Sequence, residues 1–309
     1  MRHITDAMVD AAVTADEARQ ILEEAFVAFG KQEAAMQARI RTDAGGVKLS
    51  TLGAVIPGQQ VTGAKVYTTI SGQFNFVIVL FSARDGRPLA TLEAGALTRI
   101  RTAACSVLAA SRLARQNARV LGLYGAGTQG TEHAIQMTRT LGLDRVLVHD
   151  LHGGPDLQQR LSRVTGVTVE GRSAHEIAQE ADVIVTASRS TTPLFDGATV
   201  KPGAFIAAIG SSLPTTRELD DTLLGRARSI IVEWKPQTLV EAGDLVLADR
   251  SLGLEEKIVE FPSILNGDLT RQNNDEIFLY KSVGVGLEDI ALAGLAYRNL
   301  AEREGWPAP

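Results

Sequence analysis

The chain has 309 residues, of which 45% are hydrophobic and 22% charged, and its formal net charge is −5. These values are typical of a soluble globular protein with a sizeable core, and the absence of a basic block argues against a nucleic-acid partner. The single cysteine, Cys105, excludes an intrachain disulfide, and no segment resembles a secretion signal or a membrane span. We therefore expect a cytoplasmic protein with no membrane partner, in which Cys105 is a buried small hydrophobic side chain.

The N-terminal region, residues 1–117, is predicted to combine helices with an antiparallel sheet. Thr14 followed by Glu17 forms a capping-box pattern, after which apolar residues repeat at helical spacing. Strand-like runs follow, with breaks rich in glycine and proline and a turn at residues 85–88. These runs are Ala38–Arg41, Gly63–Thr69 and Phe74–Phe81. A long helix rich in alanine and leucine, Leu97–Arg115, ends the region.

Residues 118–281 alternate between strand and helix patterns, which favours a parallel sheet flanked by helices. The predicted strands are Arg119–Tyr124, Arg145–Asp150, Asp182–Ser188, Ala204–Gly210 and Ser229–Glu233. Residues 282–309 return to a helix, from Leu287 to about Glu304. The pattern predicts the α/β class, with a Rossmann-type doubly wound parallel sheet in the middle of the chain.

A glycine-rich loop follows the first of these strands and opens a predicted helix. Gly125, Gly127 and Gly130 form G-x-G-x-x-G, in which the glycines permit a tight turn, close approach of a pyrophosphate, and close helix–strand packing. Asp150 ends the next predicted strand, where a carboxylate can accept hydrogen bonds from the adenosine ribose and repel a 2′-phosphate. The pattern predicts NAD(H), preferred over NADP(H). The alternative is a glycine-rich turn that binds no ligand.

Further motifs are spread over nearly the whole chain. They are Ala38–Ile40, Ala64–Val66, Leu97–Ala114, the glycine loop, Pro214–Asp221, Glu241–Asp244 and Ser282–Asp289. In these motifs the chain resembles the ornithine cyclodeaminase / mu-crystallin superfamily. The resemblance implies a homodimer with an α+β substrate-binding and dimerisation domain, here residues 1–117 with 282–309. It implies an NAD-binding Rossmann domain at residues 118–281.

The resemblance also implies the residues of the site. Arg39, Lys65 and Arg101 would be the catalytic and substrate-binding cations, and Arg101 would also bind the cofactor phosphate. An arginine can grip a carboxylate with two parallel hydrogen bonds, and a lysine in an apolar strand needs a partner or its pKa falls. From the residues alone, the alternatives are an exposed strand arginine, an edge-strand lysine and an exposed helix arginine.

The remaining site residues are assigned by position only. Ser212 and Val283 would contact substrate. The other cofactor contacts implied by the resemblance are Gln73, Thr102, Thr128, Gln129, Thr186, Ser188 and Ser282, of which Gln73 departs from the threonine typical of the family. The five histidines form no metal-ligand spacing, so no metal is expected, and His133 is predicted to face solvent.

Ser212 decides between the reactions that the resemblance implies. Cyclodeaminases carry an aspartate there as general acid/base, and a serine hydroxyl cannot replace it near neutral pH. Ketimine reductases of the mu-crystallin type carry a serine. Adding hydride to an iminium requires the imine to be held against the nicotinamide, which proximity can achieve. We therefore predict NADH-dependent reduction of a small α-imino acid, such as pyrroline- or piperideine-2-carboxylate, to the L-amino acid.

Two alternatives stay open. One is a cyclodeaminase-type lyase that uses bound NAD catalytically, with another acid such as Asp220 in place of the missing aspartate. The other is a non-enzymatic small-ligand binding protein of the mu-crystallin type.

Overall fold

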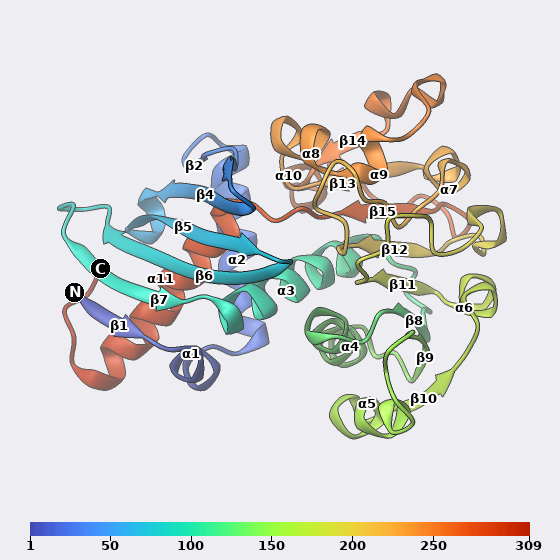
Figure 1. Ribbon diagram of the computed structural model, residues 1–309, viewed down its shortest axis with the longest axis horizontal. Coiled ribbons are helices and arrows are strands. Elements are labelled where there is room, and N and C mark those ends of the chain that lie inside the picture. The colour runs from blue at the N-terminus through green and yellow to red at the C-terminus, as the bar shows by residue number, and fades with distance from the viewer. The chain divides into compact units, whose positions relative to one another are not determined.

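The computed structural model describes residues 1–309, and the chain divides into two compact units. Unit 1 consists of Met1–Ala104 and Gly284–Pro309, and unit 2 of Cys105–Val283. Each unit is built on its own β-sheet (Figure 1). Helix α3 (Gly95–Leu113) belongs to both units, whereas the domain boundary expected from the sequence lies just after this helix.

Unit 1 contains a seven-stranded sheet in the order β1-β7-β6-β5-β4-β2, with β3 paired to β4. Its strands are β1 (Arg2–Ile4), β2 (Ala35–Met36), β3 (Ile40–Ala44), β4 (Val47–Ile56), β5 (Val61–Ile70), β6 (Gln73–Ser82) and β7 (Pro88–Glu93). Its helices are α1 (Asp6–Ala12), α2 (Ala15–Gly30), η1 (Pro57–Gln59), the start of α3, and α11 (Gly286–Glu304). The predicted antiparallel pairing is confirmed from β2 to β7, while β1 adds a parallel strand beside β7.

Local signals explain several of these elements. The capping box at α2 is confirmed: Thr14 Oγ1 accepts from Glu17 N at 3.2 Å, and the Glu17 carboxylate accepts from Thr14 N at 2.9 Å. Helix α11 packs across β4 and β5 and against α2 (Figure 1). Gly294 allows this approach, because a Cβ there would lie 2.9 Å from Val61 Cγ2.

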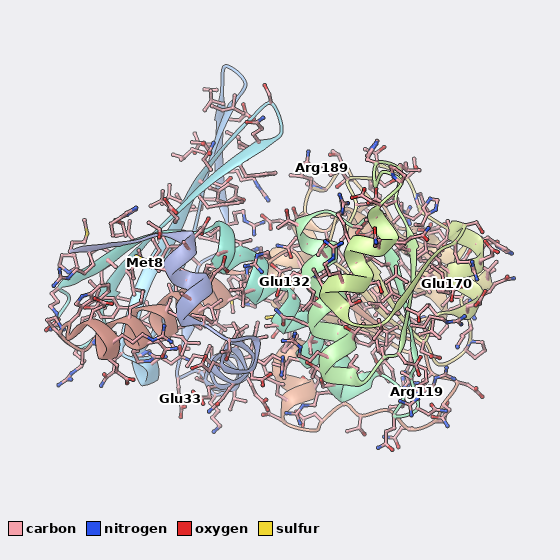
Figure 2. The ribbon with its side chains drawn as sticks, turned by 90° about the horizontal axis from the view of Figure 1, so that it is seen from below. Met8, Glu33, Arg119, Glu132, Glu170 and Arg189 are labelled. Atoms are coloured by element: carbon pink, nitrogen blue, oxygen red, sulfur yellow. The ribbon has the colours of Figure 1, made fainter.

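One face of the unit 1 sheet carries these helices, and the register places a row of apolar side chains on the other face. Ile40 pairs with Thr51, Val47 with Ile70, and Thr51 with Val66, which pairs in turn with Val77. The β3–β4 and β5–β6 turns extend beyond the helices of the same unit (Figure 2). The apolar side chains on this open face are between 43% and 62% exposed: Ile40, Val47, Leu49, Ile70 and Val77.

Unit 2 contains an eight-stranded, fully parallel sheet in the order β10-β9-β8-β11-β12-β15-β13-β14. Its strands are β8 (Val120–Tyr124), β9 (Arg145–His149), β10 (Thr168–Gly171), β11 (Val183–Thr186), β12 (Phe205–Ala208), β13 (Ser229–Val232), β14 (Ile258–Glu260) and β15 (Phe278–Lys281). Its helices, besides the end of α3, are α4 (Thr128–Leu141), α5 (Leu157–Thr165), α6 (Ala174–Glu180), η2 (Gly197–Thr199), α7 (Asp221–Arg226), α8 (Lys235–Glu241), α9 (Gly243–Val246), η3 (Arg250–Leu252), η4 (Leu254–Glu256) and α10 (Phe261–Leu265).

The sheet of unit 2 is doubly wound, as predicted. The chain runs outward from β8 through β9 to β10, and then returns to place β11 on the other side of β8. All five predicted strands form, whereas β10, β14 and β15 were not predicted. Strand β15 enters between β12 and β13, so the last strand along the chain is internal to the sheet. No helix anywhere in the chain is both long enough and apolar enough to cross a membrane.

Candidate active site

The predicted cofactor residues of unit 2 follow the carboxyl ends of its strands. Because all the strands are parallel, these ends meet at one edge of the sheet, where ligands of open α/β sheets bind. The order of the strands reverses between β8 and β11, so the switch point lies at the glycine loop. The residues that follow or end these strands are Gly125 after β8, Asp150 after β9, Thr186 and Ser188 at β11, Ser212 after β12, and Ser282 after β15.

The turn and the packing at the three fingerprint glycines fit a dinucleotide-binding loop. Gly125 has a φ of 89°, and a Cβ there would lie 2.6 Å from Ala187 O, in the loop on the other side of the switch point. A Cβ at Gly130 would lie 1.9 Å from Gly125 O, so α4 packs directly on the turn. A Cβ at Gly127 would meet nothing within 4 Å, which leaves open space above the backbone.

Helix α4 presents its N-terminus at this open space. Gly127 is the N-cap, no side chain caps the helix, and its first turn, which begins with Thr128 and Gln129, contains no acidic residue. The first N–H groups of a helix have no partner within the helix, and the helix dipole is positive there. The loop therefore fits a pyrophosphate by chemistry and by space.

Asp150 lies against the glycine loop. Its Oδ2 accepts from Ala126 N at 2.6 Å, and its Oδ1 accepts from His152 N at 2.7 Å. The residue borders a pocket of about 400 Å³ that is also lined by His149, Gly154 and Arg172. Arg172 directly follows β10 and brings a guanidinium group to this pocket. The residues next to Asp150 in the sequence include no arginine that could do so.

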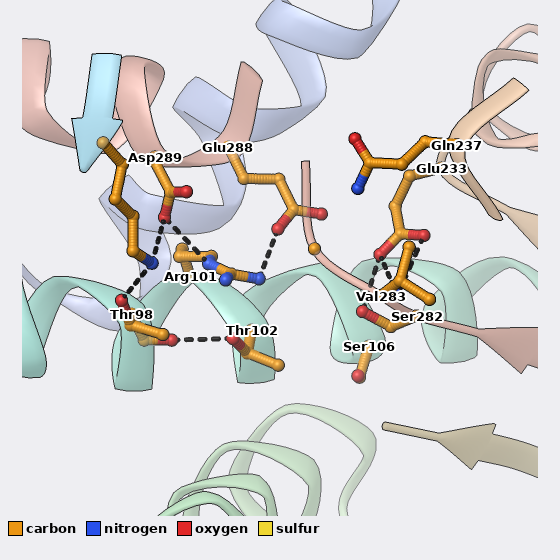
Figure 3. Close-up of polar contacts among 12 residues, drawn as sticks. Thr98, Arg101, Thr102, Ser106, Glu233, Gln237, Ser282, Val283, Glu288 and Asp289 are labelled. Atoms are coloured by element: carbon orange, nitrogen blue, oxygen red, sulfur yellow. Dashed lines mark hydrogen bonds and ion pairs between the residues drawn. The ribbon is translucent and has the colours of Figure 1, made fainter. Parts of the chain in front are cut away.

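The carboxyl edge also contains buried carboxylates to which the sequence assigned no role. Glu218 accepts from Thr186 Oγ1 at 2.8 Å and from Ser188 Oγ at 2.7 Å. Glu233, at the end of β13, accepts from Ser282 Oγ at 2.6 Å and from Val283 N at 3.2 Å (Figure 3). The motifs Pro214–Asp221 and Ser282–Asp289 were signals for these contacts, but a motif does not say which of its residues bond to one another.

His133 corrects a prediction. It is fully buried rather than solvent-facing, with Nδ1 2.8 Å from Gln129 O and Nε2 2.9 Å from Ser106 Oγ. A polar residue on an amphipathic helix can face the interior when hydrogen-bond partners there satisfy its polar atoms. Helical spacing alone does not reveal such partners. Cys105 is buried, as predicted. The structure assembles no group of three or more potential metal ligands.

In unit 1, Lys65 and Arg101 share one buried carboxylate. Lys65 Nζ lies 3.2 Å from Asp289 Oδ1 and donates to Thr98 Oγ1 at 2.7 Å. Arg101 Nε lies 3.2 Å from the same oxygen, and its Nη1 lies 2.6 Å from Glu288 Oε2 (Figure 3). The alternatives from the residues alone are therefore wrong for both cations: β5 is an internal strand, and Arg101 is 6% exposed.

Burial lowers the pKa of Lys65 from 10.5 to about 8. The attraction of Asp289 opposes this shift, and the positive charges of Arg101 and Arg39 add to it. The ammonium group also lies 4.5 Å from the centroid of the Phe76 ring, which favours the charged form. The side chain of Lys65 is therefore mostly protonated at neutral pH, and it loses its proton as the pH rises through about 8.

Arg39 reaches the same region through Gly284. It lies between β2 and β3, not within a strand as predicted, and its Nη2 donates to Gly284 O at 2.7 Å. Gly284 has a φ of 73°, and a Cβ there would lie 2.8 Å from the guanidinium of Arg101. The three predicted cations are therefore neighbours in unit 1.

Two other predicted residues of unit 1 differ in their surroundings. Thr102 is buried beside Arg101 on α3, and its hydroxyl donates to Thr98 O at 2.7 Å. Gln73 is exposed at the start of β6, paired with Ile70 at the hairpin turn, whereas Lys65 pairs with Ile78. At about 3.4 Å per residue, Gln73 is roughly 17 Å along the strand from the register of Lys65, so it does not join the cation group.

Comparison with known families identifies the family of the chain. The model of the ornithine cyclodeaminase/mu-crystallin family matches residues 2–304. The chain belongs to this family. Among curated relatives, a Δ1-pyrroline-2-carboxylate reductase from Bacillus cereus is 31% identical over 265 residues, covering 81% of this chain and 80% of the relative.

Two solved structures are similar to this chain over nearly its full length. A probable ornithine cyclodeaminase from Bordetella pertussis is 61% identical, with a TM-score of 0.99 and 100% of each chain covered. The Δ1-pyrroline-2-carboxylate reductase of Thermococcus litoralis, in complex with NADH and L-proline, is 25% identical, with a TM-score of 0.93. The match covers 99% of this chain and 98% of that one.

Proposed function

We propose that the protein is an NAD(H)-dependent reductase of a small α-imino acid, such as pyrroline- or piperideine-2-carboxylate, which it converts to the L-amino acid. Two relatives that are named as pyrroline-2-carboxylate reductases support the substrate class. On this proposal, unit 2 is the cofactor-binding domain and unit 1 is the substrate-binding and dimerisation domain.

The observation that carries the proposal is that the two carboxylates nearest to Ser212 along the loop are already engaged in hydrogen bonds. The nearest carboxylates along the loop are Glu218 and Asp220. Glu218 is occupied by hydrogen bonds to the loops after β11 and β12. Asp220 accepts from Gly197 N and Leu223 N, each at 2.8 Å, and so caps α7. Neither is available for the hydrolytic step of a cyclodeaminase, whereas imine reduction does not need one.

The chain's own residues would bind and orient the two reactants. NADH, when bound, supplies the hydride. The glycine loop and α4 would hold its pyrophosphate, and Asp150 would accept from the adenosine ribose and disfavour a 2′-phosphate. Arg39 and Arg101 would bind the substrate carboxylate, since a guanidinium matches its two oxygens. The ammonium of Lys65 would add a positive charge and a proton beside that carboxylate.

The test is a panel of cyclic and linear imino acids assayed with NADH and with NADPH at 340 nm. We expect net consumption of NADH with at least one cyclic imine, and formation of the L-amino acid. Because a structure 61% identical is named as a probable ornithine cyclodeaminase, ornithine with NAD is the essential second assay. Steady formation of proline and ammonia there would overturn the proposal. Tight NADH binding without any turnover would favour a binding protein.

We further propose a homodimer formed through the open face of the unit 1 sheet. Contiguous exposed apolar surface of this kind marks an interaction site. The double substitution of the cross-strand neighbours Val47→Glu and Ile70→Glu should convert a dimer into monomers in sedimentation equilibrium. Val164→Glu, at an exposed apolar position on α5, is the matched control and should leave the dimer intact. A monomeric unmodified protein would exclude this assembly.

A further inference from the structure

A single buried carboxylate joins the loops that follow β11 and β12. Glu218 has no exposed surface. Its Oε1 accepts from the backbone N–H and the hydroxyl of Ser188, at 2.8 and 2.7 Å. Its Oε2 accepts from Gly210 N and Thr186 Oγ1, both at 2.8 Å. Each oxygen therefore holds one backbone N–H and one hydroxyl, which uses the full accepting capacity of a carboxylate.

The two loops are in direct contact at Gly210. A Cβ there would lie 2.3 Å from Ser188 O, 2.6 Å from Ser188 N and 2.4 Å from Glu218 Oε1. No larger residue fits at this position without moving a loop. The Ser188 loop and the Gly210 loop are therefore held at one fixed separation, with Glu218 as their common partner.

The backbone of Glu218 is in turn fixed by hydrogen bonds to Asp244. Asp244 Oδ1 accepts from Glu218 N at 2.6 Å and from Leu219 N at 2.9 Å. Asp244 Oδ2 lies 2.8 Å from Lys281 Nζ, and neither side chain is exposed. Lys281 ends β15, the sheet neighbour of β12. The motifs Pro214–Asp221 and Glu241–Asp244 thus form one buried support beneath the carboxyl edge of the sheet.

We propose that Glu218 is a positioning residue for the nicotinamide half of the cofactor, an inference that rests on the proposed function. In a doubly wound sheet the dinucleotide lies across the switch point, with one nucleoside on each side of the glycine loop. Asp150, after β9, takes the adenosine side. The nicotinamide then lies over β11 and β12, where the Ser188 and Gly210 loops meet. Ser212 follows Gly210 by two residues in the same loop.

The hydrogen-bond pattern explains why a glutamate is required. A glutamine at position 218 would replace one carboxylate oxygen by an NH2 group, which would then face the donors that this oxygen accepts from. Each oxygen has a backbone N–H as partner, so either orientation of the amide sets NH2 against Ser188 N or Gly210 N. Glu218→Gln therefore keeps the size of the side chain but cannot hold both loops.

The experiment compares Glu218→Gln with Asp182→Asn, a matched control in the same sheet. Asp182 is also buried and accepts from Arg119 N at 2.8 Å and Val120 N at 3.0 Å, but at the opposite, amino edge of the strands. Four quantities are measured: the affinity for ADP-ribose, the fluorescence enhancement of bound NADH, kcat, and the KM of the imine.

For Glu218→Gln we expect kcat to fall about 10- to 100-fold, because small displacements of a positioned reactant have effects of that size. The KM of the imine and the affinity for ADP-ribose, which lacks nicotinamide, stay within about threefold, whereas the fluorescence enhancement of bound NADH falls clearly. Asp182→Asn should lose thermal stability without these changes. Equal losses of kcat and fluorescence in both variants, or none in Glu218→Gln, would overturn the proposal.

A second variant guards against a folding failure. Thr186→Val keeps the shape of the side chain and removes one of the four donors to Glu218, so it should give a smaller loss of kcat and of fluorescence enhancement. Unchanged values in a folded Thr186→Val protein would count against the inference. Failure of the unmodified protein to reduce any imine would instead overturn the proposed function. The comparison of NADH with ADP-ribose still tests Glu218 in that case, since it needs no turnover.

Discussion

Lys65 and Asp289 form an ion pair in the interior of unit 1, with Nζ 3.2 Å from Oδ1 and side-chain exposures of 3% and 0%. The same oxygen of Asp289 also forms an ion pair with Arg101. Asp289 thus supplies the only carboxylate that pairs with Lys65 and adds a second one to Arg101, which also pairs with Glu288. It keeps the two cations beside each other.

Removing the charge of Asp289 should therefore destabilise the fold. For Asp289→Asn we expect the free energy of unfolding to fall by about 3–5 kcal/mol, since breaking a buried pair leaves an uncompensated charge. Urea denaturation followed by circular dichroism measures this loss. The control is Asp10→Asn, whose partner Arg99 lies at the surface, and its effect should stay under about 1 kcal/mol. Equal effects of the two substitutions would contradict the role of Asp289.

The lowered pKa of Lys65 predicts a pH dependence. Lys65 is charged below its pKa of about 8 and neutral above it, so kcat/KM for the imino acid should fall as the pH rises through this value. The measurement is kcat/KM over two pH units on either side, corrected for the titration of the imine itself. Lys65→Arg keeps its charge throughout and should lack the inflection. The same inflection in Lys65→Arg would assign it to another group.

The sequence predicted the fold well where a local signal sets the structure. The capping box at Thr14, the glycine loop and the five predicted strands of the parallel sheet depend on neighbouring residues, and all of them formed. Strand β15 was missed because its place between β12 and β13 depends on distant pairing: Leu279 lies beside Ile206 and Ile230. Such an order is a property of the whole sheet rather than of any segment.

The candidate site divides in the same way. The glycines and the three cations could be assigned, because their chemistry is recognisable in a motif. The buried carboxylates could not. Glu218, Glu233 and Asp289 bond to Ser188, Ser282 and Lys65, which lie 30, 49 and 224 residues away in the chain. His133 was misread for the same reason, since its partner Ser106 comes from another helix.

Asp150 should control the choice between NADH and NADPH. Asp150→Ser removes a negative charge and two hydrogen-bond acceptors, and we expect the ratio of kcat/KM for NADH over NADPH to fall at least about tenfold. Arg172 lines the same pocket, so its positive charge should attract a 2′-phosphate that the carboxylate no longer repels. Adding Arg172→Ala should abolish the gain with NADPH. An unchanged cofactor ratio in Asp150→Ser would show that the carboxylate does not set the preference.

Arg39 provides the most direct test of substrate anchoring, because its contacts differ from those of its neighbours. Lys65 and Arg101 are held by Asp289, whereas Arg39 donates to the carbonyl of Gly284 and is half-buried in the link between β2 and β3. Its loss therefore leaves the buried ion pairs in place.

Arg39→Ala should remove charge-assisted contacts worth about 1.5–3 kcal/mol each. This loss corresponds to at least about a tenfold fall in kcat/KM and should appear mainly as a raised KM. Arg39→Lys keeps the charge but not the planar fork, so it should recover only part of the loss. NADH affinity, followed by fluorescence titration, should stay nearly unchanged in both variants. If Arg39→Ala weakens NADH binding while the KM of the imine stays constant, Arg39 belongs to the cofactor and the carboxylate must be bound by Lys65 and Arg101 alone.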